Sequence, residues 1–172
     1  MMNTFQSSSY EITPLTMAVI ACADKHGKTA ALALEEHDEY SIRSTPSKLI
    51  DQACKFFGSS LKGRQEGTRD VYGITHKAPV SIDPFSGMYF LPTLSPTNPN
   101  CSWIAHSHVK TLYKTKNGCA EVEFRNNRRV VFDTSYGIML NQLERTAQFR
   151  FLLEHRIRHL QRRSDMVAEP FA

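Results

Sequence analysis

The amino-acid sequence predicts an α+β fold: an antiparallel β-sheet with one helix inserted mid-chain and a long C-terminal helix. Three observations predict this class. Short apolar runs separated by turn residues fill the first third of the chain, as in strands. One apolar stripe of helical period follows Thr45, and apolar residues recur at helical spacing from Ser135 to about Arg163.

The N-terminal segments are predicted as strands. Tyr10–Ile12 and Thr16–Ala23 come first, and Asp24-Lys25-His26-Gly27 has the residues of a hairpin turn. The chain then returns through Thr29–Leu34. In Glu39–Arg43, Tyr40 and Ile42 lie on one face and Ser41 and Arg43 on the other, which predicts a further short strand.

The mid-chain helix has clear end signals. Thr45 is a good N-cap, Pro46 suits the first helical position, and Gly58 suits the C-terminal end. Between them the apolar residues form one stripe, which we expect to be buried. The stripe consists of Leu49, Ile50, Ala53, Cys54 and Phe57.

The next segments lack helical periodicity. Three glycines stand among small and basic residues around Ser59–Asp70, which predicts irregular chain there. Beyond it, we expect strands at Val71–Thr75, Met88–Leu91 and Trp103–Val109, and irregular chain at Lys77–Gly87 and Pro92–Asn100.

The last third predicts a hairpin and a helix. Ala120–Phe124 and Arg128–Phe132 flank Asn126-Asn127, which tolerate the positive φ of a tight turn. The helix from Ser135, with one break allowed, has a main stripe at Tyr136, Leu140, Leu143, Ala147 and Phe151 and further apolar residues beside it. Such a helix is either buried on two sides or part of a subunit interface. We expect one domain over residues 10–163, with flexible termini at 1–9 and 164–172.

Composition and length narrow the class of protein. The chain has 172 residues and is 41% hydrophobic, which suits a domain with a core. Its longest apolar run, Met17–Ala23, is far too short to span a bilayer, and the first basic residue follows that run, so no signal peptide is expected. We expect a soluble cytoplasmic protein, associated with the nucleoid if it binds DNA. Its cysteines are then reduced, with two disulfides as the alternative: Cys22, Cys54, Cys101 and Cys119.

The charge is unevenly distributed. The net charge is +4. Residues 1–54 hold four Lys or Arg and seven Asp or Glu, whereas residues 125–163 hold nine and three. A strongly basic last third indicates nucleic acid or an acidic partner, with a solvated basic surface as the alternative.

Signals for catalysis or a metal are weak. Nucleotide-binding and nucleophile-elbow motifs are missing, and the acidic residues are scattered, so we expect no enzyme and no cofactor. Cys101, His106 and His108 have a C-x4-H-x-H spacing, which leaves a metal-dependent hydrolase as an alternative. His155 and His159 also lie four residues apart, but the arginines around them disfavour a cation.

Three segments could contact nucleic acid. The Gly/Ser/basic segment Gly58–Arg69 can bring backbone N–H groups and cations to phosphates, and the hairpin tip has the Arg and Asn residues that read a narrow minor groove. Arg156–Arg163 could track a backbone. An ordinary exposed turn and a close chain crossing remain the alternatives for the tip and the glycine segment. The candidate contact residues are Lys55, Lys62, Arg64, Arg69, Arg125, Asn126, Arg128 and Arg129.

A resemblance to a known family covers about residues 8–160. The run Phe56-Phe57-Gly58-Ser59-Ser60 is followed by Gly63-Arg64, Gly67-Thr68, His76-Lys77, Asp83-Pro84, Trp103-Ile104 and His106-Ser107-His108-Val109. In this order these residues resemble the ComK family of competence transcription factors. The glycine-containing run is highly specific.

This resemblance implies a transcriptional activator of genetic competence, acting on DNA-uptake and recombination genes. It implies binding to paired A/T-rich boxes, largely through the minor groove, as a dimer or tetramer. It also implies delivery by an adaptor to a Clp protease, and an activator has RNA polymerase as a further candidate partner. It assigns no DNA-contacting residue, so the contacts above rest on residue chemistry.

Two departures from the family pattern leave an alternative open. Members usually have Lys-Pro-Pro where this chain has Lys77-Ala78-Pro79. Some members run further than Ala172, so we expect that adaptor-dependent degradation can differ here. The alternative function is a paralogue that regulates competence through protein contacts and does not bind DNA.

Overall fold

The computed structural model describes residues 10–167. Within them lie two antiparallel sheets and three α-helices, which confirms the α+β class and the long C-terminal helix. One sheet has the strand order β3-β2-β1-β6-β5-β4 and the other β7-β8-β9. The strands are β1 (Thr16–Ala23), β2 (Thr29–Glu35), β3 (Glu39–Ile42), β4 (Val80–Asp83), β5 (Met88–Pro92), β6 (Trp103–Ala105), β7 (Val109–Lys114), β8 (Cys119–Phe124) and β9 (Arg129–Ser135), and the helices are α1 (Pro46–Phe56), α2 (Leu61–Tyr72) and α3 (Tyr136–Val167).

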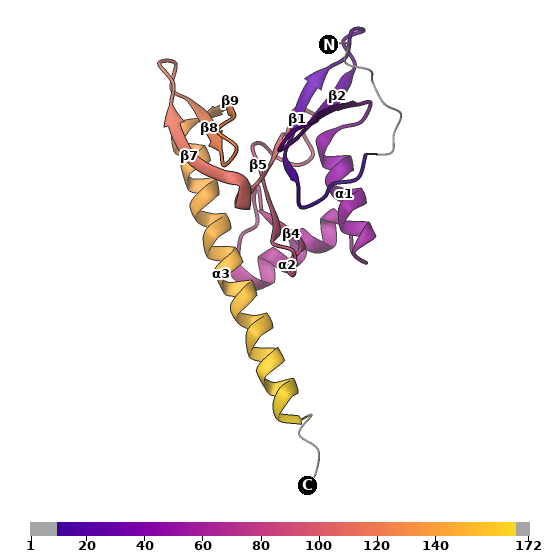
Figure 1. The fold of residues 1–172 in the computed structure, drawn as a ribbon, viewed down its shortest axis with the longest axis vertical. Helices are drawn as coiled ribbons and strands as arrows, with labels where there is room; N and C mark the ends of the chain where they lie inside the picture. The colour runs from indigo at the N-terminus through magenta and orange to yellow at the C-terminus, as the bar shows by residue number, and fades with distance from the viewer. Residues whose placement is uncertain (1–9, 168–172) are drawn as a thin grey trace.

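The two sheets lie on opposite sides of the upper half of the molecule in Figure 1. A cluster of buried apolar side chains joins them, in which Leu91 and Ile104 of the larger sheet pack with Val122 and Phe124 of the smaller one. The C-terminal half of α3 projects beyond the rest of the fold (Figure 1). No helix within residues 10–167 has the length and apolar character needed to cross a membrane.

The N-terminal hairpin confirms the prediction for residues 16–34. The Asp24 carboxylate closes its turn by accepting the N–H groups of His26 and Lys28 at 2.8 and 2.9 Å. The strand predicted at Tyr10–Ile12 is wrong, because this segment joins neither sheet. It is held instead by side-chain contacts, among them the Tyr10 hydroxyl donating to Glu35 Oε1 at 2.7 Å.

Helix α1 begins as predicted at its N-cap, where Thr45 Oγ1 accepts the Lys48 N–H at 3.3 Å. The irregular chain predicted at Ser59–Asp70 and the strand predicted at Val71–Thr75 are wrong, because α2 occupies residues 61–72. The chain therefore carries two mid-chain helices, not one. Ser60 caps α2 by accepting the Gly63 N–H at 3.0 Å, and Gly73, with φ +73°, ends it.

Tertiary contacts explain why α2 tolerates its glycines. A Cβ at residue 63 would lie 2.8 Å from Ser59 Oγ, so a larger residue there would displace that side chain. The fully buried Thr68 donates from its hydroxyl to Pro79 O at 2.6 Å, and Arg64 Nη2 donates to Ile82 O at 3.3 Å. These contacts offset a glycine cost of about 1 kcal/mol per residue.

The chain between Lys77 and Val109 is more ordered and more bent than predicted. Strand β4 lies inside the segment expected to be irregular and pairs with β5, which was predicted. The single strand expected at Trp103–Val109 is wrong. It divides into β6, a 3-10 turn at His106–His108, and β7, and this turn carries the chain from one sheet to the other.

The hairpin of β8 and β9 confirms the prediction, with Asn127 at φ +68°. Helix α3 is also confirmed and runs without a break to Val167, so residues 164–167, expected in a flexible terminus, are helical. The flexible termini expected at 1–9 and 168–172 lie outside the described residues. Its predicted stripe is partly wrong, because Leu140 and Phe151 are exposed. The buried face includes two polar residues, Gln142 and Thr146. Gln142 Nε2 donates to Lys77 O and Pro92 O at 3.0 and 2.8 Å, so an apolar pattern could not reveal this face.

Candidate nucleic-acid interface

The hairpin tip docks onto an acidic turn of the larger sheet. This acidic turn, between β2 and β3, contains Glu35, Glu36, Asp38 and Glu39. Arg128 Nη2 pairs with Glu39 Oε2 at 2.8 Å, and Asn126 Nδ2 donates to Glu36 O at 2.9 Å. The predicted groove-reading tip is thus engaged with its own protein in this structure.

The two flanking arginines of the hairpin differ in their surroundings. Arg125 Nε donates to Ser107 O at 2.7 Å, and no carboxylate within residues 10–167 pairs with this side chain. Arg129 lies 3.2 Å from Glu121 and 3.5 Å from Glu123, with its guanidinium 4.2 Å from the centre of the Tyr113 ring. A hydrogen bond from Tyr113, and then one from Lys110, hold the Glu123 pKa below its ordinary value. Arg125 is therefore freer to meet an anion than Arg129.

The candidate residues around α2 also separate into two kinds. Lys62 and Arg69 are exposed, whereas Arg64 is half-buried and turns inward to β4. Lys55 forms an ion pair with Asp51 at 2.8 Å, and Asp51 Oδ1 accepts the Leu61 N–H at 2.9 Å, next to the start of α2. Of these four, only Lys62 and Arg69 are exposed and also have no carboxylate partner in the described chain.

Lys62 and Arg69 line a groove of about 580 Å³ between α2 and the loop that contains Ser95. His76 and Lys77 extend its basic side, and the acidic residues in its lining are Glu66 and Asp51, of which Asp51 is paired with Lys55. The groove can therefore hold a negatively charged chain beside exposed cations.

Helix α3 contributes arginines next to α2. Arg156 Nη1 lies 3.1 Å from Asp70 Oδ2, and Arg145 Nη2 donates to His76 O at 2.8 Å. The glycine segment and the basic helix, far apart in sequence, are thus neighbours, while the hairpin docks elsewhere. Arg145 and Lys77 were not among the candidate contact residues. No local signal points to Arg145, since its contact with His76 joins positions 69 apart.

The proposed metal ligands do not come together. Cys101 is buried and its thiol donates to Leu94 O at 3.4 Å, while His108 Nε2 lies 2.7 Å from Pro14 O. Residues 10–167 contain no group of three His, Cys, Asp or Glu side chains that could hold a metal ion. The structure thus gives no support to a metal-dependent hydrolase built on Cys101, His106 and His108.

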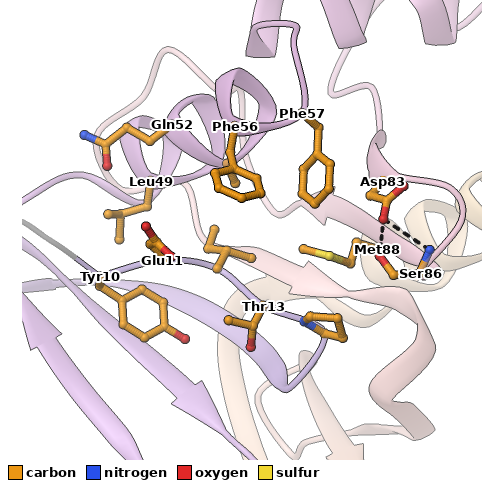
Figure 2. A pocket seen from close by; sticks show the side chains of 13 residues that line it. Tyr10, Glu11, Thr13, Leu49, Gln52, Phe56, Phe57, Asp83, Ser86 and Met88 are labelled. Atoms are coloured by element: carbon orange, nitrogen blue, oxygen red, sulfur yellow. Dashed lines mark hydrogen bonds between the residues drawn. The ribbon is translucent and has the colours of Figure 1, made fainter.

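An apolar pocket of about 590 Å³ lies on a different part of the surface. Figure 2 shows Phe56 and Phe57, at the end of α1, above the N-terminal segment with Tyr10 and beside Met88. Phe56 is 75% exposed, and the two phenyl rings meet edge to face at 5.0 Å between centroids. Among the described residues, no Lys, Arg or His lines this pocket, so it is not part of the cationic surface.

The described residues thus present a groove lined by exposed cations and a separate apolar pocket. Comparison with known proteins gives the class and then the family. The competence transcription factor of Bacillus subtilis (strain 168) is 38% identical over 151 residues, which cover 88% of this chain and 78% of that relative. A family model described as ComK protein matches residues 7–158, and no solved structure matches. The chain belongs to the ComK family and is a competence transcription regulator, which is not an enzyme class.

Proposed function

We propose that the protein binds A/T-rich promoter DNA and activates competence genes for DNA uptake and recombination. The observation that carries this proposal is its 38% identity to a competence transcription factor along most of both chains. The exposed cations beside the α2 groove support it, because phosphate contacts supply most of the affinity of a DNA-binding protein. Such a protein acts on the nucleoid in the cytoplasm.

We propose two contact regions. Lys62 and Arg69 hold phosphate beside the groove, Lys55 adds a contact from its position next to Asp51, and Arg64 acts by fixing α2 against β4. The hairpin tip, with Arg125, Asn126, Arg128 and Arg129, reads the minor groove once it leaves the acidic turn. Arg and Asn suit that task because the minor groove of A/T-rich DNA is narrow and electronegative.

Binding as a dimer or tetramer would place two such modules along the duplex. The projecting part of α3 supports self-association, because Phe151 is 63% and Leu160 64% exposed. Exposed apolar side chains on a helix are typical of an interface. A Clp adaptor and RNA polymerase are proposed as further partners on the strength of the family.

The test is a fluorescence anisotropy titration with an A/T-rich duplex. Lys62→Ala with Arg69→Ala should weaken binding and reduce the salt slope of log K by about 0.9 for each phosphate that the variant no longer neutralises. Arg128→Ala with Arg129→Ala tests the hairpin in the same way, and far-UV circular dichroism checks folding. Lys48→Ala, an exposed charge on α1, is the matched control.

Two outcomes would contradict the proposal. Unchanged affinity and salt slope in a folded double variant would remove that region from the interface. Equal affinity of the wild-type protein for A/T-rich and G·C-rich duplexes would favour the alternative, a regulator of competence that acts through protein contacts.

A further inference from the structure

A basic hollow lies where the chain passes from the larger sheet to the smaller one. It has a volume of about 410 Å³ and is lined by His106, Ser107, Val109, Arg125, Leu143 and Arg150. Three elements supply its charged groups: the 3-10 turn, the β8–β9 hairpin and α3. None of the sequence motifs pointed to this combination.

Both guanidinium groups are held in place by their neighbours. Arg125 is fixed by its 2.7 Å hydrogen bond to Ser107 O. Arg150 lies over the Tyr89 ring, 5.0 Å from its centre, and against Gly87, where a Cβ would come within 3.1 Å of Nη2. Gly87 also has φ +72°, so glycine is favoured there for two reasons. A guanidinium that is already oriented loses little freedom when it binds an anion.

The carboxylates near the hollow do not neutralise it. Glu154 pairs with Arg150 Nε at 2.8 Å, and Arg125 pairs with no carboxylate in the described chain. One positive charge therefore remains without a partner, and the Nη groups of Arg150 stay available beside it. Two guanidinium forks suit a tetrahedral oxyanion, because each can offer paired N–H donors.

The third ionisable group of the hollow is His106. Within residues 10–167 its Nδ1 atom is buried and has no hydrogen-bond partner, which is energetically costly. Burial, and then the fields of Arg150 and Arg125, lower its pKa from the ordinary 6.5, while Glu154 acts in the opposite direction. The same two arginines that disfavour an imidazolium ion therefore favour an anion.

We propose that this hollow binds one phosphate group of the DNA backbone, held by Arg125 and Arg150 with His106 as the third contact. This proposal rests on the proposed function and reassigns Arg125 from the groove-reading tip to a third contact point, at the junction of the two sheets. The bound phosphate stabilises the protonated imidazole, so binding is strengthened at low pH and loses that contribution as pH rises through the pKa of His106 in the complex.

The test compares Arg125→Gln, Arg150→Gln and the double variant for binding to an A/T-rich duplex as a function of salt. If both arginines hold one phosphate, each single variant lowers the salt slope by up to about 0.9, and the double variant lowers it by little more. Lys25→Gln, at the exposed β1–β2 turn, controls for the removal of one charge. A melting curve for each variant checks folding, and Arg125→Gln keeps the test valid if Arg150→Gln unfolds.

A second measurement uses pH. Wild-type affinity should rise more between pH 7.5 and pH 5.5 than the affinity of His106→Asn. Unchanged slopes and equal pH dependence, in protein that still binds the duplex, would overturn this site and leave the proposed function standing.

Inorganic phosphate distinguishes the source of the ligand. If wild-type protein binds no duplex but is stabilised by inorganic phosphate relative to chloride at equal ionic strength, and Arg125→Gln is not, the hollow binds a free phosphate ligand and its assignment to DNA is wrong. If neither duplex nor phosphate binds, both the site and the proposed function are wrong.

Discussion

The ion pair between Arg128 and Glu39 provides a quantitative test of whether the hairpin tip reaches DNA. In the structure these side chains are 41% and 40% exposed, and Nη2 lies 2.8 Å from Oε2. A pair this exposed is worth about 0.2–1 kcal/mol. Glu39→Gln keeps the size of the side chain and removes its charge, so the folded protein should lose no more than that.

Glu39→Gln should strengthen DNA binding, although it slightly destabilises the folded protein. If Arg128 must leave Glu39 to enter the minor groove, Glu39→Gln removes the cost of breaking that ion pair. A gain of about 1 kcal/mol corresponds to roughly fivefold tighter binding, which is the upper limit we expect for Glu39→Gln. Fluorescence anisotropy with an A/T-rich duplex at constant salt measures it.

Asp38→Asn is the matched control for this prediction. Asp38 belongs to the same acidic turn and is exposed, and no ion pair is formed by its side chain within residues 10–167. Asp38→Asn removes one negative charge, as Glu39→Gln does, but leaves the Arg128–Glu39 ion pair intact. Equal affinities of the two variants, or weaker binding by Glu39→Gln, would refute the reasoning and show that the docked tip is a structural contact.

Three further predictions concern the stability and chemistry of the helical region. Ser60→Ala removes the α2 cap and should cost about 1 kcal/mol, which lowers Tm by about 2–4 °C in a circular dichroism melt; an unchanged Tm would show that the cap contributes nothing. Gly67→Ala places a Cβ with nothing within 4 Å and should stabilise α2 by about 0.5–1 kcal/mol. Gly63→Ala must displace Ser59 Oγ and should therefore stabilise α2 less. Equal increases in Tm for the two variants would contradict the close approach at residue 63. Burial raises the pKa of the Cys54 thiol to about 11. In native protein at pH 8, iodoacetamide should therefore modify the exposed Cys22 well before Cys54, as followed by peptide mass spectrometry. The reverse order would show that the apolar face of α1, which contains Cys54, is not buried.

Local signals were sufficient for several elements of the fold. The Thr45-Pro46 cap and one apolar stripe predicted α1, and the Asn126-Asn127 turn predicted the β8–β9 hairpin. In both cases the residues that determine the element are adjacent in sequence. The start of α3 was predicted for the same reason.

Helix α2 was missed because its stabilising contacts are not local. Its glycines indicate irregular chain, but the Thr68 hydroxyl bonds to Pro79 O and Arg64 bonds to Ile82 O. Propensity is a weak signal that tertiary packing overrides. The break of the predicted strand at His106 has a similar origin, since the chain must turn there to enter the second sheet.

The candidate contact residues were also only partly predictable, because contacts between distant parts of the chain determine which of them are free. Residue chemistry identified cations, but their availability depends on distant partners: Arg128 meets Glu39 across 89 positions. Arg64 turns inward and donates to Ile82 O, whereas its basic side chain indicated an exposed position. The hollow formed by His106, Arg125 and Arg150 was unpredictable because three separate elements build it.

The most direct test of the central claim, selective binding of A/T-rich DNA, is a competition titration. A labelled A/T-rich duplex is bound by the wild-type protein and displaced with unlabelled A/T-rich or G·C-rich duplex of equal length at one salt concentration. We predict that the A/T-rich competitor displaces the label at a concentration at least about tenfold lower, a difference of about 1.4 kcal/mol. Equal displacement by both competitors, or no binding of the labelled duplex, would contradict the account.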